Sequence, residues 1–222
     1  MGQMIDLKAS DGNSIGAYVA APSGKARGGI VVVQEIFGVN RHIKAVADGF
    51  AADGYHAIAP AFFDRVEKNV DLGYSPAEIE KARGYIPKLN MDNVMLDVNA
   101  AVKVVAGAGK VGIVGYCWGG TVAWVAAAKA TGLSAAIAYY GGGVAANVGL
   151  TPRIPVMFHW GAEDHAIPLT DVHKVEMAHP SAPSHIYAAG HGFNCDERGS
   201  WNELCAKLAR GRTLEFLQKH VG

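Results

Sequence analysis

The chain has 222 residues, half of them hydrophobic, and its 20 basic residues balance its 20 acidic residues. This length and hydrophobic content suffice to bury one substantial core, so we expect a single domain over residues 1–222. A balanced charge provides no field that would attract nucleic acid or an anionic membrane surface. We therefore expect a small-molecule partner, no nucleic acid, no membrane, and a monomer or small homo-oligomer.

The N-terminal residues and the cysteines indicate a reducing compartment. The first residues lack a basic stretch followed by an apolar core, and no run of about 18 apolar residues occurs. Three cysteines, an odd number, fit free thiols better than a disulfide framework. No C-x-x-C or H-E-x-x-H spacing is present, so we expect no metal ion, no cofactor and a cytoplasmic location.

The predicted strands and helices alternate along the chain. A Ser-Asp-Gly-Asn turn predicts a hairpin at its N-terminal end. The last helix carries Trp201, Leu204, Cys205 and Leu208 on one apolar stripe, which predicts that Cys205 lies in the core. Continuously apolar strands between helices predict an α/β fold, a mostly parallel sheet with helices on both faces and a site at the carboxyl ends of its strands. Strands are expected at 4–9, 15–20, 29–34, 56–59, 111–114, 135–139, 155–160 and 184–188, and helices at about 43–54, 77–86, 91–106, 119–130, 169–178 and 200–219.

Residues 110–124 combine a strand, a sharp turn and a helix around one cysteine. Gly115 and Gly119 flank Cys117 at the spacing of a nucleophile elbow, with sulfur in place of the usual serine oxygen. The start of the helix favours thiolate over thiol, because unpaired N–H groups and the positive end of the helix dipole face the sulfur. Cys117 is therefore the predicted nucleophile, and a buried cysteine in a glycine-rich turn is the alternative.

An elbow nucleophile requires an acid and a histidine later in the chain. Of the seven histidines after Cys117, only His191 lies between glycines and directly after a short predicted strand. Asp164 follows another predicted strand through a Gly-Ala-Glu turn and is the favoured acid, with Glu163 as its competitor.

Glu35 ends the most apolar strand, at the loop that supplies one oxyanion donor in this architecture. The backbone N–H of Ile36 is the predicted donor from this loop, and that of Trp118 is the second donor. A carboxylate near Cys117 either opposes formation of the thiolate or accepts the thiol proton. A solvated loop residue is the alternative for Glu35.

The chain resembles the dienelactone hydrolase family in motifs spread over nearly its whole length. These motifs are residues 34–40, 115–120, 139–141, 161–164 with Pro168, 191–193 and 212–217. The resemblance implies an α/β-hydrolase fold without a large lid domain, and a triad of Cys117, Asp164 and His191 that hydrolyses a lactone or small activated ester. It also implies that Glu35 gates ionisation of the cysteine. Phe37, Tyr140 and Phe193 are the implied pocket residues.

One position departs from the family pattern. Members resemble one another in having, four residues after the histidine, an arginine that holds the substrate carboxylate. In this chain that position is Cys195. A second family arginine lies in the helical region before the elbow strand, where Lys81 and Arg83 are the candidates. Cys195 itself allows two interpretations, a small residue of the pocket wall or a redox partner of Cys117.

Two other classes of function are compatible with these residues. One is a non-catalytic α/β-hydrolase fold in which Cys117 senses oxidants or the pocket binds a ligand. The intact acid and histidine favour hydrolysis over this alternative. The other is acyl transfer or peptide cleavage by the same three residues, for which no extended groove is evident.

Overall fold

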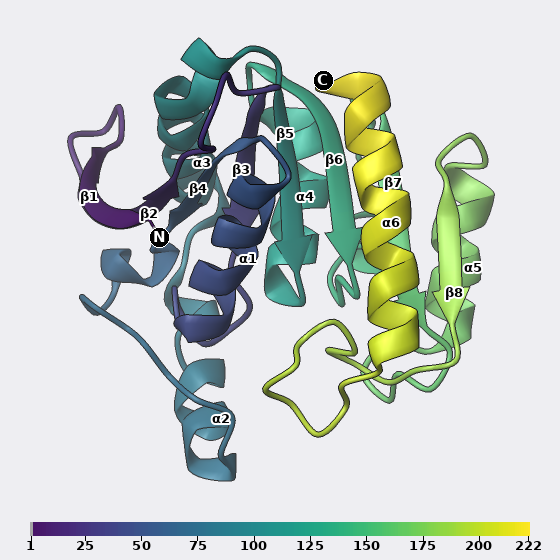
Figure 1. The fold of residues 1–222 in the computed structure, drawn as a ribbon. Coiled ribbons are helices and arrows are strands. Elements are labelled where there is room, and N and C mark those ends of the chain that lie inside the picture. The colour runs from purple at the N-terminus through teal and green to yellow at the C-terminus, as the bar shows by residue number, and fades with distance from the viewer. Residues whose placement is uncertain (1) are drawn as a thin grey trace.

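The computed structural model describes residues 2–222, and an eight-stranded sheet forms its centre (Figure 1). The strand order is β1-β2-β4-β3-β5-β6-β7-β8. The predicted hairpin is confirmed, because β1 (Gln3–Lys8) pairs antiparallel with β2 (Ser14–Ala20), and β2 also runs antiparallel to β4 (His56–Pro60). The remaining strands are parallel to their neighbours: β3 (Gly29–Val33), β5 (Val111–Tyr116), β6 (Leu133–Tyr139), β7 (Val156–Gly161) and β8 (Ser184–Tyr187).

Helices cover both faces of this sheet, and residues 2–222 contain no lid domain (Figure 1). On one face lie α1 (Arg41–Ala52) and α6 (Glu203–His220), and on the other lie α3 (Met91–Val105), α4 (Trp118–Lys129) and α5 (Leu169–Ala178). The short α2 (Pro76–Arg83) extends beyond the carboxyl edge of the sheet. This is the predicted α/β-hydrolase fold. None of the helices within residues 2–222 has both the length and the apolar character needed to cross a membrane.

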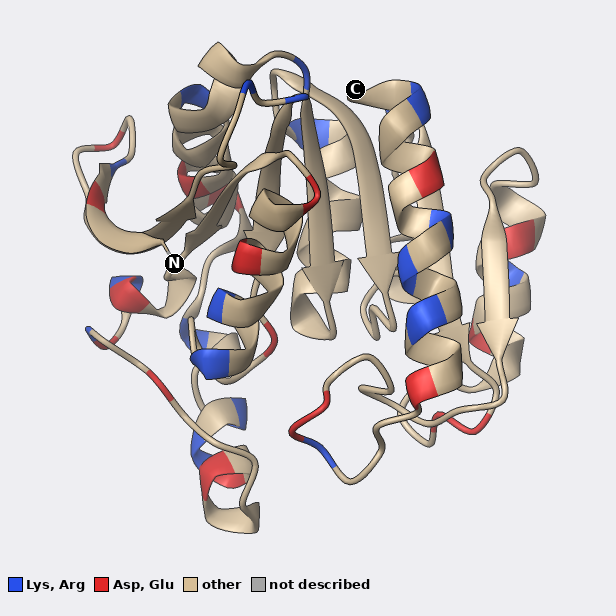
Figure 2. Ribbon diagram, in the orientation of Figure 1, with Lys and Arg blue, Asp and Glu red and all other residues tan. Residues whose placement is uncertain are grey.

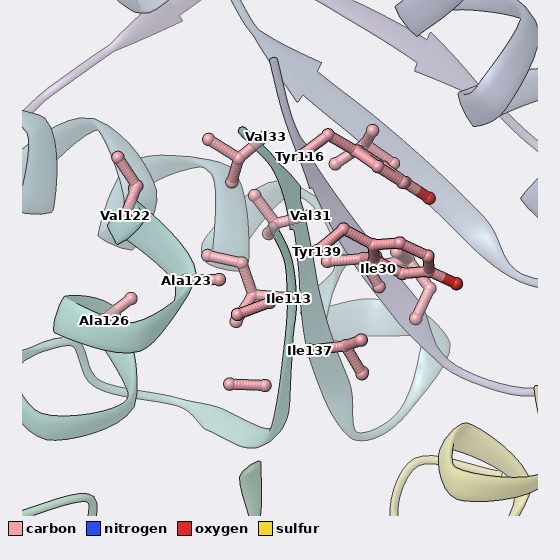
Figure 3. Close-up of a cluster of buried hydrophobic side chains, with 14 of the residues drawn as sticks. Ile30, Val31, Val33, Ile113, Tyr116, Val122, Ala123, Ala126, Ile137 and Tyr139 are labelled. Atoms are coloured by element: carbon pink, nitrogen blue, oxygen red, sulfur yellow. The ribbon is translucent and has the colours of Figure 1, made fainter. Parts of the chain in front are cut away.

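The core fills the space on both sides of the central strands (Figure 3). On β5, Ile113 points toward α4, whereas Tyr116 points to the opposite face. Val122, Ala123 and Ala126 of α4 pack on the first of these faces. Because β5 and α4 are buried almost throughout, both read as continuous apolar runs in the sequence. The elbow between them is thus attached to the most buried part of the molecule.

The orientation of α6 differs from the prediction. Leu204 and Leu208 are 81% and 51% exposed, so the predicted apolar stripe faces solvent. Cys205 is half-buried and packs at the edge of the core rather than inside it. The prediction was wrong because α6 contacts the sheet largely through small side chains, which let it approach closely, while these two leucines lie on its solvent side. The buried residues of α6 are Ala206, Ala209, Thr213, Phe216 and Leu217.

Candidate active site

The turn after β5 holds Cys117 in a strained conformation at the carboxyl edge of the sheet. Its φ of 57° and ψ of −119° are rarely adopted by a residue with a side chain. A Cβ on Gly115 would lie 1.8 Å from the carbonyl oxygen of Gly119, and one on Gly119 would lie 2.5 Å from that of Gln34. Both glycines are therefore required by the close approach of strand and helix, as the elbow spacing predicts.

Cys117, His191 and Asp164 lie in one hydrogen-bonded row. Cys117 Sγ is 3.1 Å from His191 Nε2, and His191 Nδ1 is 2.7 Å from Asp164 Oδ2. Asp164 is buried, and its Oδ1 accepts hydrogen bonds from the N–H groups of Ala166 and Ile167 at 2.8 and 3.2 Å. These backbone donors fix the orientation of the carboxylate, which in turn orients the imidazole.

The surroundings of His191 stabilise its imidazolium form. Burial by itself lowers the pKa of His191, but hydrogen bonds to Asp164 and Cys117 outweigh this effect and raise the pKa from 6.5 to about 10. An imidazolium in contact with Cys117 Sγ favours the thiolate as its counter-ion. Glu163, the competing acid, is exposed and takes no part in this row.

Glu35 lies in a buried polar cluster with Arg198 and Tyr74. Its Oε1 accepts a hydrogen bond from Arg198 Nη1 at 2.9 Å, and its Oε2 accepts one from the Tyr74 hydroxyl at 3.2 Å. Glu35 is only 1% exposed, so Arg198 supplies the counter-charge that a buried carboxylate needs. No hydrogen bond joins Glu35 to Cys117 in this structure, unlike the contact that the resemblance implies.

Arg198 is a site residue that the sequence analysis missed. Burial lowers the pKa of Arg198, but the charges of Glu35 and Cys117 outweigh this effect and raise it. The guanidinium also lies 5.8 Å from the ring centre of Phe37 and 5.9 Å from that of Tyr74. The sequence offered one signal, a basic residue in the loop that follows the predicted histidine. Arg198 lies seven residues after His191, whereas the position four residues after it, where the family has its arginine, is Cys195.

A cleft of about 610 Å³ opens beside the imidazole of the row. Arg83, at the end of α2, lines this cleft, whereas Lys81 pairs with Glu67 at 3.1 Å on the surface and does not. Cys117 is not part of the lining and lies half-buried next to His191. The side chains that line the cleft include Arg83, Glu163, His165, His191, Arg198 and Trp201.

The three aromatic residues expected at the pocket are buried behind these side chains. The ring centre of Tyr140 lies 5.2 Å from that of His191 and 5.4 Å from that of Phe193. Phe37 packs edge-on against Tyr74 with the ring centres 4.6 Å apart. None of the three lines the cleft, so they support the residues that border it.

The two predicted oxyanion donors lie on adjacent loops. β3 and β5 pair in parallel with Val33 opposite Gly115, so the loop after β3 begins beside the elbow. Ile36 belongs to the first of these loops and Trp118 directly follows Cys117, and both residues are half-buried.

Comparison with known proteins identifies the family. The Dienelactone hydrolase family matches residues 15–221. The chain belongs to this family. The carboxymethylenebutenolidase of Pseudomonas putida is 31% identical over 224 residues, covering 96% of this chain and 94% of that protein. Carboxymethylenebutenolidase 1 of Cupriavidus pinatubonensis is 28% identical, covering 96% and 95%.

A solved structure agrees with this dienelactone hydrolase family assignment. A Klebsiella pneumoniae protein, described as a proposed dienelactone hydrolase, superposes with a TM-score of 0.82 at 30% identity. The match covers 99% of this chain and all of the other. The chain is therefore a dienelactone hydrolase-like hydrolase.

Proposed function

We propose that this dienelactone hydrolase family member hydrolyses lactones or small activated esters, with Cys117 as nucleophile. The hydrogen-bonded row is the observation that supports this most strongly, because sulfur, imidazole and carboxylate are joined at 3.1 and 2.7 Å. Acyl transfer needs such a nucleophile, a base beside it and an acid that orients the base. The relatives named as carboxymethylenebutenolidases support the choice of a lactone or enol ester as substrate.

In the first half of the reaction the Cys117 thiolate attacks the carbonyl carbon, and the His191 imidazolium balances its charge. The N–H groups of Ile36 and Trp118 donate hydrogen bonds to the oxygen as the carbonyl becomes tetrahedral. When the tetrahedral adduct collapses, the carbon–oxygen bond of the ester breaks and the leaving oxygen takes the proton from His191. A thioester on Cys117 remains.

In the second half, water hydrolyses this thioester. The neutral imidazole of His191 takes a proton from the water, whose oxygen attacks the acyl carbon. The Cys117 thiolate leaves, the acid is released and the imidazolium is restored. Asp164 keeps the Nδ1 proton of the imidazole in place throughout, so that Nε2 faces the reacting atoms.

The sulfur nucleophile restricts the substrate. A thiolate is a better leaving group than an alkoxide, so the adduct with a simple alkyl ester tends to collapse back to substrate. With a lactone or enol ester the leaving oxygen anion is stabilised, so the adduct collapses forward to the thioester more readily. We therefore expect weak activity on alkyl esters.

The cleft wall carries one exposed arginine suited to an acidic substrate, Arg83, beside one exposed carboxylate, Glu163. Arg83 is exposed at the wall of the cleft, and no ion pair involves it within residues 2–222. Arg198 lines the same cleft but is already paired with Glu35. Arg83 thus provides a positive charge for a substrate carboxylate at this cleft.

Steady-state hydrolysis of cis- and trans-dienelactone and of p-nitrophenyl acetate tests the proposal. Replacing the nucleophile in Cys117→Ala should lower kcat by about 10⁴-fold or more, while circular dichroism and the melting temperature remain unchanged. Cys205→Ala is the matched control, because this half-buried cysteine lies on α6, outside the row. If Cys117→Ala retained turnover, Cys117 would not be the nucleophile. If the wild type hydrolysed p-nitrophenyl acetate but neither dienelactone, an acidic lactone would not be the substrate.

A further inference from the structure

Two buried side chains near the site, His42 and Cys195, have no part in the proposed hydrolysis. Together with Glu35 they offer three metal-ligand atoms that all lie within 4.8 Å of one another. Their exposures are 1% for Glu35, 4% for His42 and 0% for Cys195. Glu35 follows β3, His42 lies in the first turn of α1, and Cys195 lies in the loop between β8 and α6. The fold, and not a local sequence motif, brings them together.

His42 gives a second and independent observation. Its Nδ1 lies 3.2 Å from Asp196 Oδ1, whereas its buried Nε2 has no hydrogen-bond partner among residues 2–222. When Nδ1–H donates to a carboxylate, Nε2 keeps a lone pair that points to the other side of the ring. Because Asp196 lies at the surface, that other side faces the protein interior. A buried polar atom left without a partner costs about 1–3 kcal/mol, which a bound cation would remove.

We propose that Glu35, His42 and Cys195 form a binding site for a divalent metal ion of the zinc type. Thiolate, imidazole and carboxylate together are a ligand set that suits zinc, and tetrahedral zinc places such ligands about 3.3–3.6 Å apart. The observed spread of up to 4.8 Å requires only a modest contraction. Asp196 then forms the carboxylate–histidine–metal arrangement that orients a ligating imidazole.

Binding of a divalent cation brings the charges around the cluster to zero. Zinc binding forms a sulfur–metal bond and releases the thiol proton of Cys195 to solvent. The carboxylates of Glu35 and Asp196, the new thiolate, the Arg198 guanidinium and the cation then sum to zero, compared with −1 for the protein alone. Figure 2 shows an acidic and a basic stretch next to each other in the loop between β8 and α6, near the carboxyl edge of the sheet. Arg198 occupies Glu35 Oε1 through its hydrogen bond, so the metal binds Oε2, which also accepts the hydrogen bond of the Tyr74 hydroxyl at 3.2 Å.

Cobalt and zinc titration of the full-length protein tests this site. The titration uses a Cys117→Ser background, which removes the catalytic thiol as a competing ligand. Co²⁺ should produce a thiolate-to-cobalt charge-transfer band at one equivalent, and Zn²⁺ should abolish the band. Loss of a residue that hydrogen-bonds a metal ligand typically weakens metal binding about 10–100-fold, so Asp196→Asn should weaken Co²⁺ binding by a factor in this range. Cys195→Ser and His42→Gln should each weaken binding by more than about 100-fold.

Cys205→Ser is the matched control, because Cys205 is half-buried on α6 and is not one of the three ligands. Its affinity for Co²⁺ should equal that of the background protein. A missing charge-transfer band overturns the proposal, and so does a band that survives Cys195→Ser or disappears with Cys205→Ser. If circular dichroism shows that Cys195→Ser does not fold, His42→Gln decides: unchanged binding in this variant overturns the site.

Discussion

The two loops that carry the site are held in place by different forces. The elbow after β5 is fixed by its own backbone, since Gly115 and Gly119 allow strand and helix to approach more closely than any side chain permits. The loop between β8 and α6 is held by side chains that pair with distant segments, above all Arg198 with Glu35. The elbow places the nucleophile, and the loop sets the charges around it.

This difference predicts how each region responds to substitution. A substitution at Gly115 or Gly119 of the elbow acts through steric contact, so any side chain introduced there should lower stability. A change in the loop acts through charge and should depend on whether the partner remains buried without compensation. The residue that joins the two regions is His191, which belongs to the loop and contacts Cys117 of the elbow.

The largest effect is expected where the connection between the two regions is weakened. Asp164→Asn removes the charge that orients and stabilises the His191 imidazolium, and kcat for p-nitrophenyl acetate should fall by between about 10² and 10⁴-fold. Glu163→Gln, at the exposed neighbouring carboxylate, should change kcat less than tenfold. If Glu163→Gln caused the greater loss, Glu163 and not Asp164 would be the acid of the triad.

The next effect tests the loop. Arg198→Met leaves the carboxylate of Glu35 buried without a counter-charge, and the free energy of unfolding in urea should fall by about 3–5 kcal/mol. Glu35→Gln combined with Arg198→Met should recover part of this loss. Arg41→Met is the control, because its pair with Glu197 is 84% exposed on the arginine side and contributes little. A double variant less stable than Arg198→Met alone would contradict a simple charge pair.

A steric test of the elbow is expected to have a somewhat smaller effect. In Gly119→Ala the new Cβ would lie 2.5 Å from carbonyl oxygens of Gln34 and Val33, and backbone atoms cannot yield cheaply. We expect the free energy of unfolding to fall by about 1–3 kcal/mol. We expect kcat to fall as well, by a factor that corresponds to a larger free energy than this loss of stability. Gly211→Ala in α6 meets no atom within 4 Å and should stabilise by about 0.5–1 kcal/mol. Equal stabilities of the two variants would show that the elbow can adjust.

The sequence was sufficient to predict features that depend on local pattern. The order of strands and helices follows from apolar runs separated by turn residues, and Gly115, Cys117 and Gly119 mark the elbow because the turn needs those residue types. The face of α6 could not be read in the same way. Its contact surface is built from alanine, threonine and two larger residues, while exposed leucines dominate a count of hydrophobicity.

The surroundings of the nucleophile depend on contacts that local pattern does not contain. Arg198 and Glu35 are 163 residues apart in the sequence, and their ion pair forms because two loops meet at the carboxyl edge of the sheet. His42 and Cys195 meet in the same way. A scan for close ligand spacing could not find such a cluster, because its members come from different elements.

The smallest expected effect measures how strongly the elbow and the loop are coupled. Cys117 contributes to the raised pKa of His191, about 10, through a hydrogen bond and its charge. In Cys117→Ala this contribution is lost while burial, which lowers the pKa, remains. The pKa of His191 should therefore fall by at least about one unit, equivalent to about 1.4 kcal/mol, as measured from imidazole NMR resonances against pH. The wild-type imidazolium should persist until the pH approaches 10, and Cys205→Ala should titrate like the wild type. An unchanged pKa in Cys117→Ala would show that Asp164 alone holds the proton and that the thiolate of the elbow does not depend on the loop.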